Sequence, residues 1–323
     1  MSAATDVVLN VDGLRVNAAD PSGAEVPIIE DVSFSLARGE VLGIVGESGS
    51  GKSLTALSLL RLTPETLHQS GSIRVAGREV MRLSQRELQR MRGNQVSMVF
   101  QDPMTGLNPV RTVGSLLVEA LRRHRRMSRA QAHQSAVAAL RAVGIPSPEL
   151  RVKVYPHQLS GGLRQRVMIA LALLHDPAVI VADEPTTALD ATIQAQIIDL
   201  MRSRVSSAGL IFITHDLGVA GQICDRIIVM YAGHIVEEGV ALTLLSRPRH
   251  PYTAGLLAAA PRFDRERKPL VPIPGSPPTP YSRPAGCPFA PRCARASEVC
   301  REQRPELVPG DLSTVACWHP LSS

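Results

Sequence analysis

Aromatic residues are scarce in this sequence: five Phe, four Tyr and one Trp make up 3% of its 323 residues. Proteins that bind single-stranded nucleic acid commonly stack its bases on aromatic side chains. The formal net charge of +6 is also too small to require such a partner. We therefore expect no nucleic-acid partner, and a core built from Ala, Val, Leu and Ile.

Long hydrophobic runs are lacking as well. The longest apolar stretch of note, Val167–Leu174, is far shorter than the roughly 20 residues that a membrane-spanning helix needs. The N-terminal residues MSAATDVVLNVDGLRV lack the basic and apolar regions of a secretion signal. We expect an intracellular chain with no membrane span of its own.

The prolines are unevenly distributed, since 15 of the 25 lie between Arg247 and Ser323. Proline lacks an N–H donor and fixes φ, so regular helices and central strands do not form at that density. The sequence therefore predicts a regular domain over residues 1–246 and an irregular C-terminal extension over residues 247–323.

Within residues 1–246, short β-branched runs alternate with patterns of helical spacing. Buried strands are predicted at 41–45, 96–100, 179–182, 210–214 and 226–230, and helices at 52–62 and 163–174. This alternation predicts an α/β fold with a mainly parallel sheet. Residues 7–16 and 72–75 are expected to form antiparallel strands. Residues 103–175 are expected to form a helical insertion.

The strongest single motif is a phosphate loop, G-x-x-x-x-G-K-[ST], between an apolar strand and a helical run. Its residues are Gly46, Glu47, Ser48, Gly49, Ser50, Gly51, Lys52 and Ser53. The glycines let consecutive backbone N–H groups close around phosphates, and the helix N-terminus adds positive potential. Lys52 is expected to reach the β- and γ-phosphates of a nucleotide, and the Ser53 hydroxyl to ligate Mg²⁺.

A second buried run ends in two carboxylates, Asp183 and Glu184. Alone, such a pair is typical of a solvated strand end. Beside a phosphate loop, however, a strand that delivers an Asp to the metal is expected. We predict that Asp183 holds Mg²⁺ through water and that Glu184 polarises the attacking water as a general base.

A third motif, LSGGLRQR at residues 159–166, lies just before a predicted helix. Together with the two preceding motifs, it resembles the signature loop of the ATP-binding subunits of ABC transporters. Its serine and glycines present hydrogen-bond donors at a helix N-terminus, which makes a second anion site. Leu163 stands where the commonest family form has Gln. The resemblance implies that the ATP bound by a partner subunit is contacted by Ser160, Gly161, Gly162 and Gln165.

Three further positions match the same family. Gln101 resembles the Q-loop glutamine, which senses Mg²⁺ and water and connects to the membrane subunits. Asp190, in Ala188-Leu189-Asp190, resembles the D-loop, and His215 resembles the switch histidine that contacts the γ-phosphate. The resemblance implies catalytic roles for Gln101 and His215 beside Glu184, and it adds Gln101 to the Mg²⁺ ligands Ser53 and Asp183. It also implies a head-to-tail dimer that buries two ATP molecules.

One departure from the family concerns the adenine ring. These subunits usually stack adenine on an aromatic residue of the N-terminal strand region, but residues 14–27 contain no Phe, Tyr or Trp. Stacking contributes about 1–3 kcal/mol in comparable base contacts. We therefore expect apolar packing of adenine and a modest affinity for the nucleotide.

The C-terminal extension resembles that of dipeptide and oligopeptide importer ATPases. The similarity is carried by HPYT at 250–253, PIPGSPP at 272–278 and GCPFAPRC at 286–293. The segment YPHQ at 155–158, just ahead of the signature loop, fits the same subfamily.

Four of the five cysteines lie in this extension, at Cys287, Cys293, Cys300 and Cys317. In a reducing cytosol a disulfide is the less common use of such a group. Zinc sites usually contain a tight C-x₂₋₄-C pair, which is absent, whereas long irregular spacing suits a larger inorganic core. The resemblance implies a [4Fe–4S] cluster at these four positions, with Zn²⁺ or free thiols as the alternatives.

The combined resemblance implies an ATPase subunit, with ATP and Mg²⁺ as cofactors, that powers import of di- or oligopeptides at the cytoplasmic face of the membrane. The implied partners are a second ATP-binding subunit, identical or paralogous, two transmembrane permease subunits and an extracytoplasmic peptide-binding protein. The alternatives are an importer of nickel, glutathione or a glycoside, a soluble ABC ATPase that acts on DNA or ribosomes, and an ATP-binding regulator that hydrolyses poorly.

Overall fold

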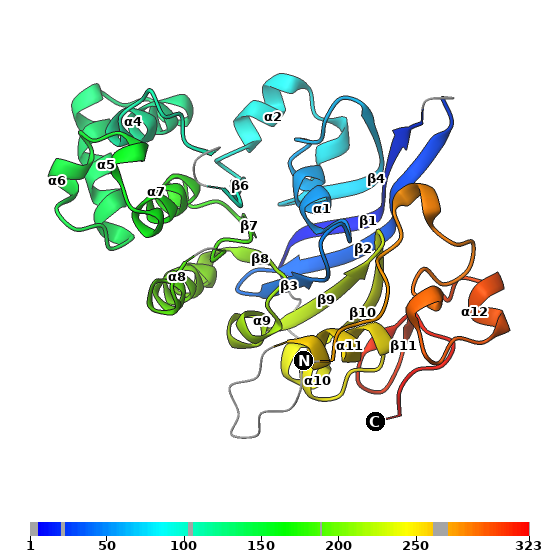
Figure 1. Ribbon diagram of the computed structural model, residues 1–323. Coiled ribbons are helices and arrows are strands. Elements are labelled where there is room, and N and C mark those ends of the chain that lie inside the picture. Colours follow the sequence, from blue (N-terminus) through cyan, green and yellow to red (C-terminus); the bar gives the residue numbers. More distant parts are fainter. Residues whose placement is uncertain (1–5, 21–22, 103–105, 188, 261–270, 323) are drawn as a thin grey trace. The chain divides into compact units, whose positions relative to one another are not determined.

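The computed structural model describes residues 6–20, 23–102, 106–187, 189–260 and 271–322 (Figure 1). Contacts between residues divide the chain into two compact units, each made of several segments. The described residues of the first unit lie within Met1–Leu9, Leu36–Glu40 and Arg74–Ile211, and those of the second within Asn10–Ser35, Val41–Ile73 and Phe212–Ser323. None of the helices in the described ranges has the length and apolar character needed to span a membrane.

The second unit contains the phosphate loop and the C-terminal extension. Its fully buried strand β3 (Val41–Val45) pairs in parallel with β9 (Arg226–Tyr231). Strand β10 (His234–Val240) pairs antiparallel with β9, and its other edge pairs with β12 (Thr314–Val315), a strand of the extension. β11 (Val308–Pro309) then pairs with β12. The extension therefore adds two short strands to the sheet that carries the phosphate loop.

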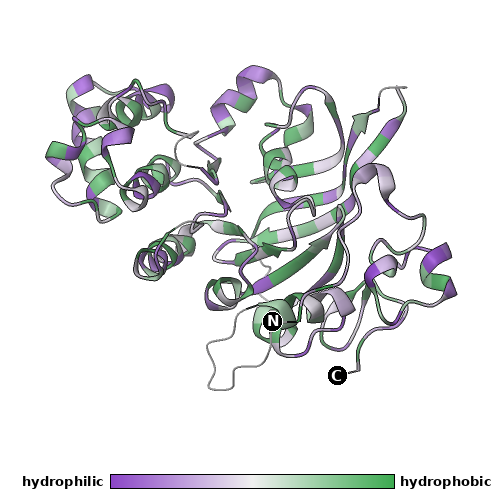
Figure 2. Cartoon of the chain, in the orientation of Figure 1, coloured by the Kyte–Doolittle hydropathy of each residue, from purple (hydrophilic) through white to green (hydrophobic). Residues whose placement is uncertain are grey.

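Helices and two long strands complete the second unit. The helices are α1 (Lys52–Leu59), α9 (Leu217–Ile223), α10 (Ala241–Ser246), α11 (Pro251–Ala259) and α12 (Glu298–Glu302), with 3₁₀ turns at Pro280–Ser282 and Ala290–Arg292. Strand β2 (Glu25–Ala37) neighbours β1 (Val7–Ala19) in the strand order. Hydrophobic residues are concentrated along β9 (Figure 2), and its side chains are buried apart from the half-buried Arg226.

The first unit contains the carboxylate motif and the helical insertion. Strand β6 (Val96–Val99) pairs in parallel with β7 (Val179–Asp183). β8 (Gly209–Thr214) begins with N–H bonds from Gly209 to Ala178 O and from Leu210 to Glu40 O. Strand β4 (Leu67–Val75) belongs to the second unit as far as Ile73, and its last two residues pair antiparallel with β5 (Arg78–Glu79) in the first unit. Helices α2 (Gln85–Met91) and α8 (Ala191–Arg204) and 3₁₀ turns at Val80–Arg82 and Val205–Ser207 also belong to it.

The helical insertion forms a bundle of α4 (Val113–His124), α5 (Arg129–Ala142), α6 (Pro148–Arg151) and α7 (Gly161–Leu173), with a 3₁₀ turn at Pro156–Gln158 (Figure 1). Thr112, Ser128 and Ser160 cap α4, α5 and α7 by accepting a bond from a backbone N–H of the first turn. Hydrophilic and hydrophobic residues alternate along these helices (Figure 2), and Leu117, Leu121 and Leu140 are fully buried among them.

The predicted α/β class, with antiparallel strands and a helical insertion, is confirmed. The predicted start of the insertion falls on residues 103–105, which lie outside the described ranges. The predicted helix 52–62 is too long, because α1 ends at Leu59 and Arg61 adopts a left-handed conformation with φ 49°. The short helices, strands and turns of the extension were not predicted, because its many prolines interrupt the periodic patterns that indicate such elements.

Candidate functional site

The phosphate loop connects β3 to α1 in the second unit. Three of its glycines have positive φ, at 152° for Gly46, 79° for Gly49 and 103° for Gly51. A Cβ atom on Gly46 would lie 2.2 Å from the carbonyl oxygen of Met230. The loop therefore requires glycine here, both for its backbone conformation and for its close approach to β9.

The Lys52 ammonium group closes this loop. Its Nζ donates to the carbonyl oxygens of Gly46 and Glu47, each at 2.8 Å, and to Ser50 Oγ at 3.4 Å. Lys52 is 6% exposed, so the positive charge lies inside the curve of the loop. This arrangement can bind a nucleotide phosphate chain through backbone N–H groups and one cation.

Two residues of the extension contact the second residue of the loop, Glu47. The guanidinium group of Arg292 makes two hydrogen bonds to its carboxylate, at 2.6 and 3.0 Å. The backbone N–H of Glu47 donates to the Tyr252 hydroxyl at 2.8 Å. Sequence reasoning missed both contacts, because no motif spacing links residue 47 to residues 252 and 292.

His215 follows the last residue of β8 in the second unit and is exposed. The next residue, Asp216, caps α9 by accepting bonds from Gly218 N and Val219 N. Thr214 Oγ1 accepts from the Asp216 N–H at 3.0 Å. His215 therefore projects from a turn that is fixed on both sides.

In the first unit, the parallel pairing of β6 and β7 brings Gln101 and Glu184 together. Gln101 Nε2 donates to Glu184 Oε2 at 3.2 Å, and Thr187 Oγ1 donates to the same oxygen at 2.8 Å. Asp183, the last residue of β7, is 4% exposed. Glu184 has a left-handed φ of 47°, a conformation that non-glycine residues adopt at a cost and that is common at functional sites.

The signature loop lies at the N-terminus of α7. Ser160 and Gly161 are exposed, and Ser160 Oγ accepts a bond from Leu163 N at 3.4 Å. Gln165 is instead 3% exposed, and its Nε2 has no hydrogen-bond partner among the described residues. The exposed donors of this loop are therefore those of the serine and the glycines.

Asp190 caps α8, because its Oδ1 accepts a bond from Ile193 N at 2.9 Å. Gly162 packs closely on the same helix, and a Cβ atom there would lie 2.9 Å from Ile193 Cγ2. Gly162 of the signature loop therefore packs against the helix that Asp190 caps. Ala188, the first residue of the expected D-loop, lies outside the described ranges.

All four cysteines of the extension line one small pocket, together with Phe289, Trp318 and His319. None of the four forms a disulfide. Burial raises the pKa of the Cys287 thiol to about 11 and also raises the pKa of the Cys317 thiol. In the described part of the chain, no group of three or more His, Cys, Asp or Glu side chains is placed to hold a metal ion.

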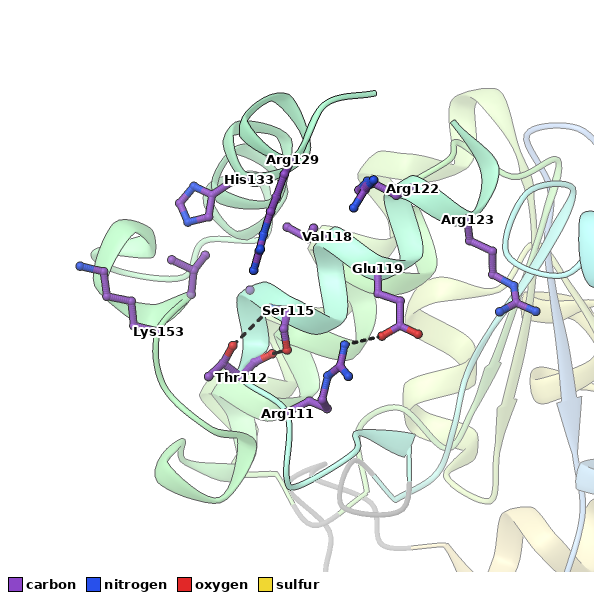
Figure 3. A pocket seen from close by; sticks show the side chains of 12 residues that line it. Arg111, Thr112, Ser115, Val118, Glu119, Arg122, Arg123, Arg129, His133 and Lys153 are labelled. Carbon is purple, nitrogen blue, oxygen red and sulfur yellow. Dashed lines mark hydrogen bonds and ion pairs between the residues drawn. The ribbon is translucent and has the colours of Figure 1, made fainter. Parts of the chain in front are cut away.

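A larger, basic pocket lies on the helical insertion (Figure 3). It has a volume of about 770 Å³ and is lined by α4, the start of α5 and the segment after α6. Its acidic lining residue, Glu119, is paired with Arg111 at 2.7 Å. The other charged or titratable lining residues are Arg122, Arg123, Arg129, His133 and Lys153.

The phosphate loop and the carboxylate strand carry the sequence motifs of a P-loop ATPase. Residues 29–187 match the family described as "ABC transporter", and residues 236–300 match "Oligopeptide/dipeptide transporter, C-terminal region". The chain is an ABC ATPase.

Similar proteins place the chain more closely. It is 49% identical over 320 residues to the oligopeptide transport ATP-binding protein OppD of Escherichia coli K12, which covers 98% of this chain and 94% of that protein. It is 47% identical over 316 residues to the dipeptide transport ATP-binding protein DppD of Bacillus subtilis 168, covering 96% of this chain and 94% of that protein. This chain belongs to the oligopeptide and dipeptide group of ABC transporter ATP-binding subunits.

A solved structure supports the fold. The ATP-binding cassette MJ0796, described as a dimer in a post-hydrolysis state bound to ADP and Pi, matches with a TM-score of 0.64 and 26% identity. The match covers 72% of this chain and 98% of the cassette.

Proposed function

We propose that this chain hydrolyses ATP to power the import of di- or oligopeptides through a membrane ABC transporter. The observation that carries the proposal is the C-terminal extension. It matches the C-terminal region of peptide transporters, and it is built into the unit that holds the phosphate loop. We assign residues 1–246 to the ATP-binding domain and residues 247–323 to the extension.

Residues of the phosphate loop, of the carboxylate strand and of the Q-loop have different proposed roles in hydrolysis. The loop residues 46–53 hold the phosphates, and Ser53, Asp183 and Gln101 are the proposed ligands of Mg²⁺. Their hydroxyl, carboxylate and amide oxygens are the hard donors that Mg²⁺ prefers. The ion supplies charge neutralisation at the phosphates.

Glu184 is the proposed general base. Its carboxylate is oriented by Gln101 and Thr187, which both donate to Oε2, and a carboxylate can accept a proton from the attacking water. His215 is the proposed contact of the γ-phosphate. Its fixed position between Thr214 and the capping Asp216 supports such a role.

The signature loop is proposed to bind the ATP of a second ATP-binding subunit. Ser160 and Gly161 are exposed at a helix N-terminus, where backbone N–H groups favour an anion. Gly162 and the buried Gln165 complete the proposed signature-loop residues, and Asp190 is the proposed D-loop contact. ATP then joins two subunits head to tail, and its hydrolysis releases them.

The helical insertion and the Gln101 region are the proposed docking site of two transmembrane permease subunits. The basic pocket of Figure 3 supports this, since its lining has more basic than acidic side chains and so suits an acidic segment of a partner. These contacts would hold the chain at the cytoplasmic face of the membrane. An extracytoplasmic binding protein is the proposed source of the peptide.

A [4Fe–4S] cluster is the proposed occupant of the cysteine pocket. The fit to the structure lies in the donor set, since four free cysteines line one largely apolar pocket. A single Zn²⁺ needs its sulfurs about 2.3 Å from one point, whereas a cluster holds four thiolates around a larger core. Bound thiolates would be deprotonated despite the raised thiol pKa values of Cys287 and Cys317.

The cluster is tested by iron, sulfide and zinc analysis of protein purified without oxygen. Four iron and four sulfide ions per chain, lost together in Cys293→Ser, support the proposal. One zinc ion per chain, or intact thiols without metal, contradicts it.

The transport function is tested by the ATPase activity of the chain assembled with its permease subunits and peptide-binding protein. Peptide mixtures are expected to stimulate turnover, and Glu184→Gln is expected to abolish it. Turnover that ignores peptides but responds to nickel, glutathione or a glycoside would contradict the cargo assignment and leave the ATPase standing.

A further inference from the structure

The phosphate loop contains an acidic residue that is held by the C-terminal extension. Arg292 Nη1 donates to Glu47 Oε2 at 2.6 Å and Nη2 donates to Oε1 at 3.0 Å. The side chain of Arg292 is 4% exposed and that of Glu47 is 26% exposed. A bidentate, largely buried pair of this kind is both strong and directional.

Arg292 is itself fixed by its surroundings. Its Nε donates to Pro274 O at 2.8 Å and its Nη1 to the Tyr231 hydroxyl at 3.3 Å. The guanidinium carbon lies 5.8 Å from the centre of the Tyr231 ring and 5.9 Å from that of Phe289. The hydrogen bonds to Glu47 raise the pKa of Arg292 above its ordinary value, so the group stays charged.

The main chain of Glu47 is fixed as well. Its N–H donates to the hydroxyl of Tyr252, which is fully buried. The ring of Tyr252 packs against Tyr231 and Phe289, with centroids 4.5 and 5.4 Å apart. The extension therefore holds both the carboxylate and the amide group of one loop residue.

The electrostatic consequence concerns the phosphates. A phosphate loop binds a multiply charged anion, and an unpaired carboxylate inside the loop would repel that anion at short range. We propose that Arg292 is a positioning residue for the nucleotide, which neutralises Glu47 and holds it so that the loop can accept a triphosphate. This inference rests on the proposed role of residues 46–53 in ATP binding.

The test is the dissociation constant for ATP, measured by equilibrium binding to the full chain. Arg292→Ala is expected to raise it about tenfold, because the Glu47 charge is no longer paired. Arg292→Lys is expected to lie between this variant and the unaltered protein, since lysine cannot make the bidentate pair. The double variant Arg292→Ala/Glu47→Gln is expected to recover most of the lost affinity, because the repelling charge is gone.

Arg304→Ala is the matched control. Arg304 also joins the extension to a carboxylate of the core, Glu30 on β2, through a hydrogen bond at 2.5 Å. We expect its ATP affinity to stay within about twofold of the unaltered protein, because the charge of Glu30 is also balanced by Arg283 at 2.7 Å. Limited proteolysis of each variant reports whether the extension stays docked.

Two results would overturn the inference. If Arg292→Ala binds ATP with unchanged affinity, Arg292 does not position the loop for the nucleotide. If the double variant binds ATP as weakly as Arg292→Ala does, the arginine acts through packing alone and not by neutralising Glu47. The variant Lys52→Ala distinguishes a failure of the proposed ATP site from a failure of the role given to Arg292. If Lys52→Ala binds ATP normally, the loop assignment itself fails; if it loses ATP while Arg292→Ala does not, only this inference fails.

Discussion

At the scale of single residues, Thr187 is the clearest case of a side chain that acts through another. It donates to the same Glu184 oxygen as Gln101 does, and Glu184 is held in a left-handed conformation. We expect Thr187→Val to lower kcat about tenfold with little change in KM, because Glu184, the proposed general base, loses one of the groups that orient it.

The Thr187 prediction is checked by steady-state ATPase kinetics of the transporter and by a double-mutant cycle. Adding Thr187→Val to Glu184→Gln is expected to cost nothing further, since both changes affect one carboxylate. Fully additive losses would show that Thr187 acts independently of Glu184.

His250 links single-residue chemistry to stability. It is 1% exposed, its Nδ1 accepts a bond from Tyr252 N at 3.0 Å, and burial lowers its pKa to about 3 from 6.5. Between these two values the unfolded chain binds a proton that the folded chain does not. Stability is therefore full above pH 6.5 and is lost as the pH falls, by about 1.4 kcal/mol per pH unit from this group.

Asparagine at position 250 can keep the capping acceptor without titrating. We expect His250→Asn to be less stable than the unaltered protein at pH 7.5, with the difference shrinking between pH 6.5 and 4.5. Urea unfolding at several pH values measures this. A constant difference across that range would mean that His250 does not titrate as its burial demands.

At the scale of elements, β10 is the strand to which the extension attaches. Its Glu237 is fully buried and accepts bonds from Arg249 N, His250 N and Ser313 Oγ at 2.7, 3.0 and 2.9 Å. Glu237→Ala leaves three donors without an acceptor, two of them in buried and one in a part-buried hydrogen bond. We expect a loss of ~3 kcal/mol in the free energy of unfolding and faster cleavage of the extension by protease.

The neighbouring Glu238 provides the control for this prediction. It pairs with Arg226 at 3.0 Å in a more exposed position, so Glu238→Ala is expected to cost about 1 kcal/mol or less. Equal losses in the two variants would contradict the importance of the three hydrogen bonds to Glu237.

The same scale shows what sequence patterns can and cannot predict. Buried strands β3 and β7 and capped helices α5 and α7 follow from local residues, because β-branched runs and Ser caps act within a few positions. Strand β12 has two residues in a proline-rich segment and exists through pairing with β10, more than 70 positions earlier, as Glu237↔Val315 shows. No local pattern contains that information.

The candidate site likewise has one part that follows from local sequence and another that depends on distant residues. Motifs in the sequence single out residues 46–53, Gln101 and Glu184, and the structure adds the hydrogen bond that joins Gln101 to Glu184. The contacts of Glu47 with Tyr252 and Arg292 depend on how the extension folds back, and they were invisible beforehand. Of the residues expected to contact a partner's ATP, Ser160 and Gly161 are exposed, whereas Gln165 is buried because helical periodicity turns it inward.

At the scale of the whole molecule, the proposed mechanism requires two subunits. We expect Glu184→Gln, which should bind ATP without hydrolysing it, to form a dimer with ATP and to stay monomeric with ADP. Ser160→Arg is expected to prevent that dimer, because a bulky side chain then occupies the exposed N-terminus of α7. Light scattering after size exclusion measures both states, and an ATP-independent dimer that tolerates Ser160→Arg would argue against the head-to-tail arrangement.

The pair formed by Glu47 and Arg292 also sets an order of events during synthesis. The two residues are 245 positions apart, and at about 5–20 residues per second the ribosome needs about 12–49 seconds to pass from one to the other. A nascent chain therefore displays its nucleotide loop long before the arginine that completes the loop has been made. Chains that stop early, before residue 292, are released with an unneutralised acid in that loop, so incomplete products should compete poorly for ATP and for places in an assembled transporter.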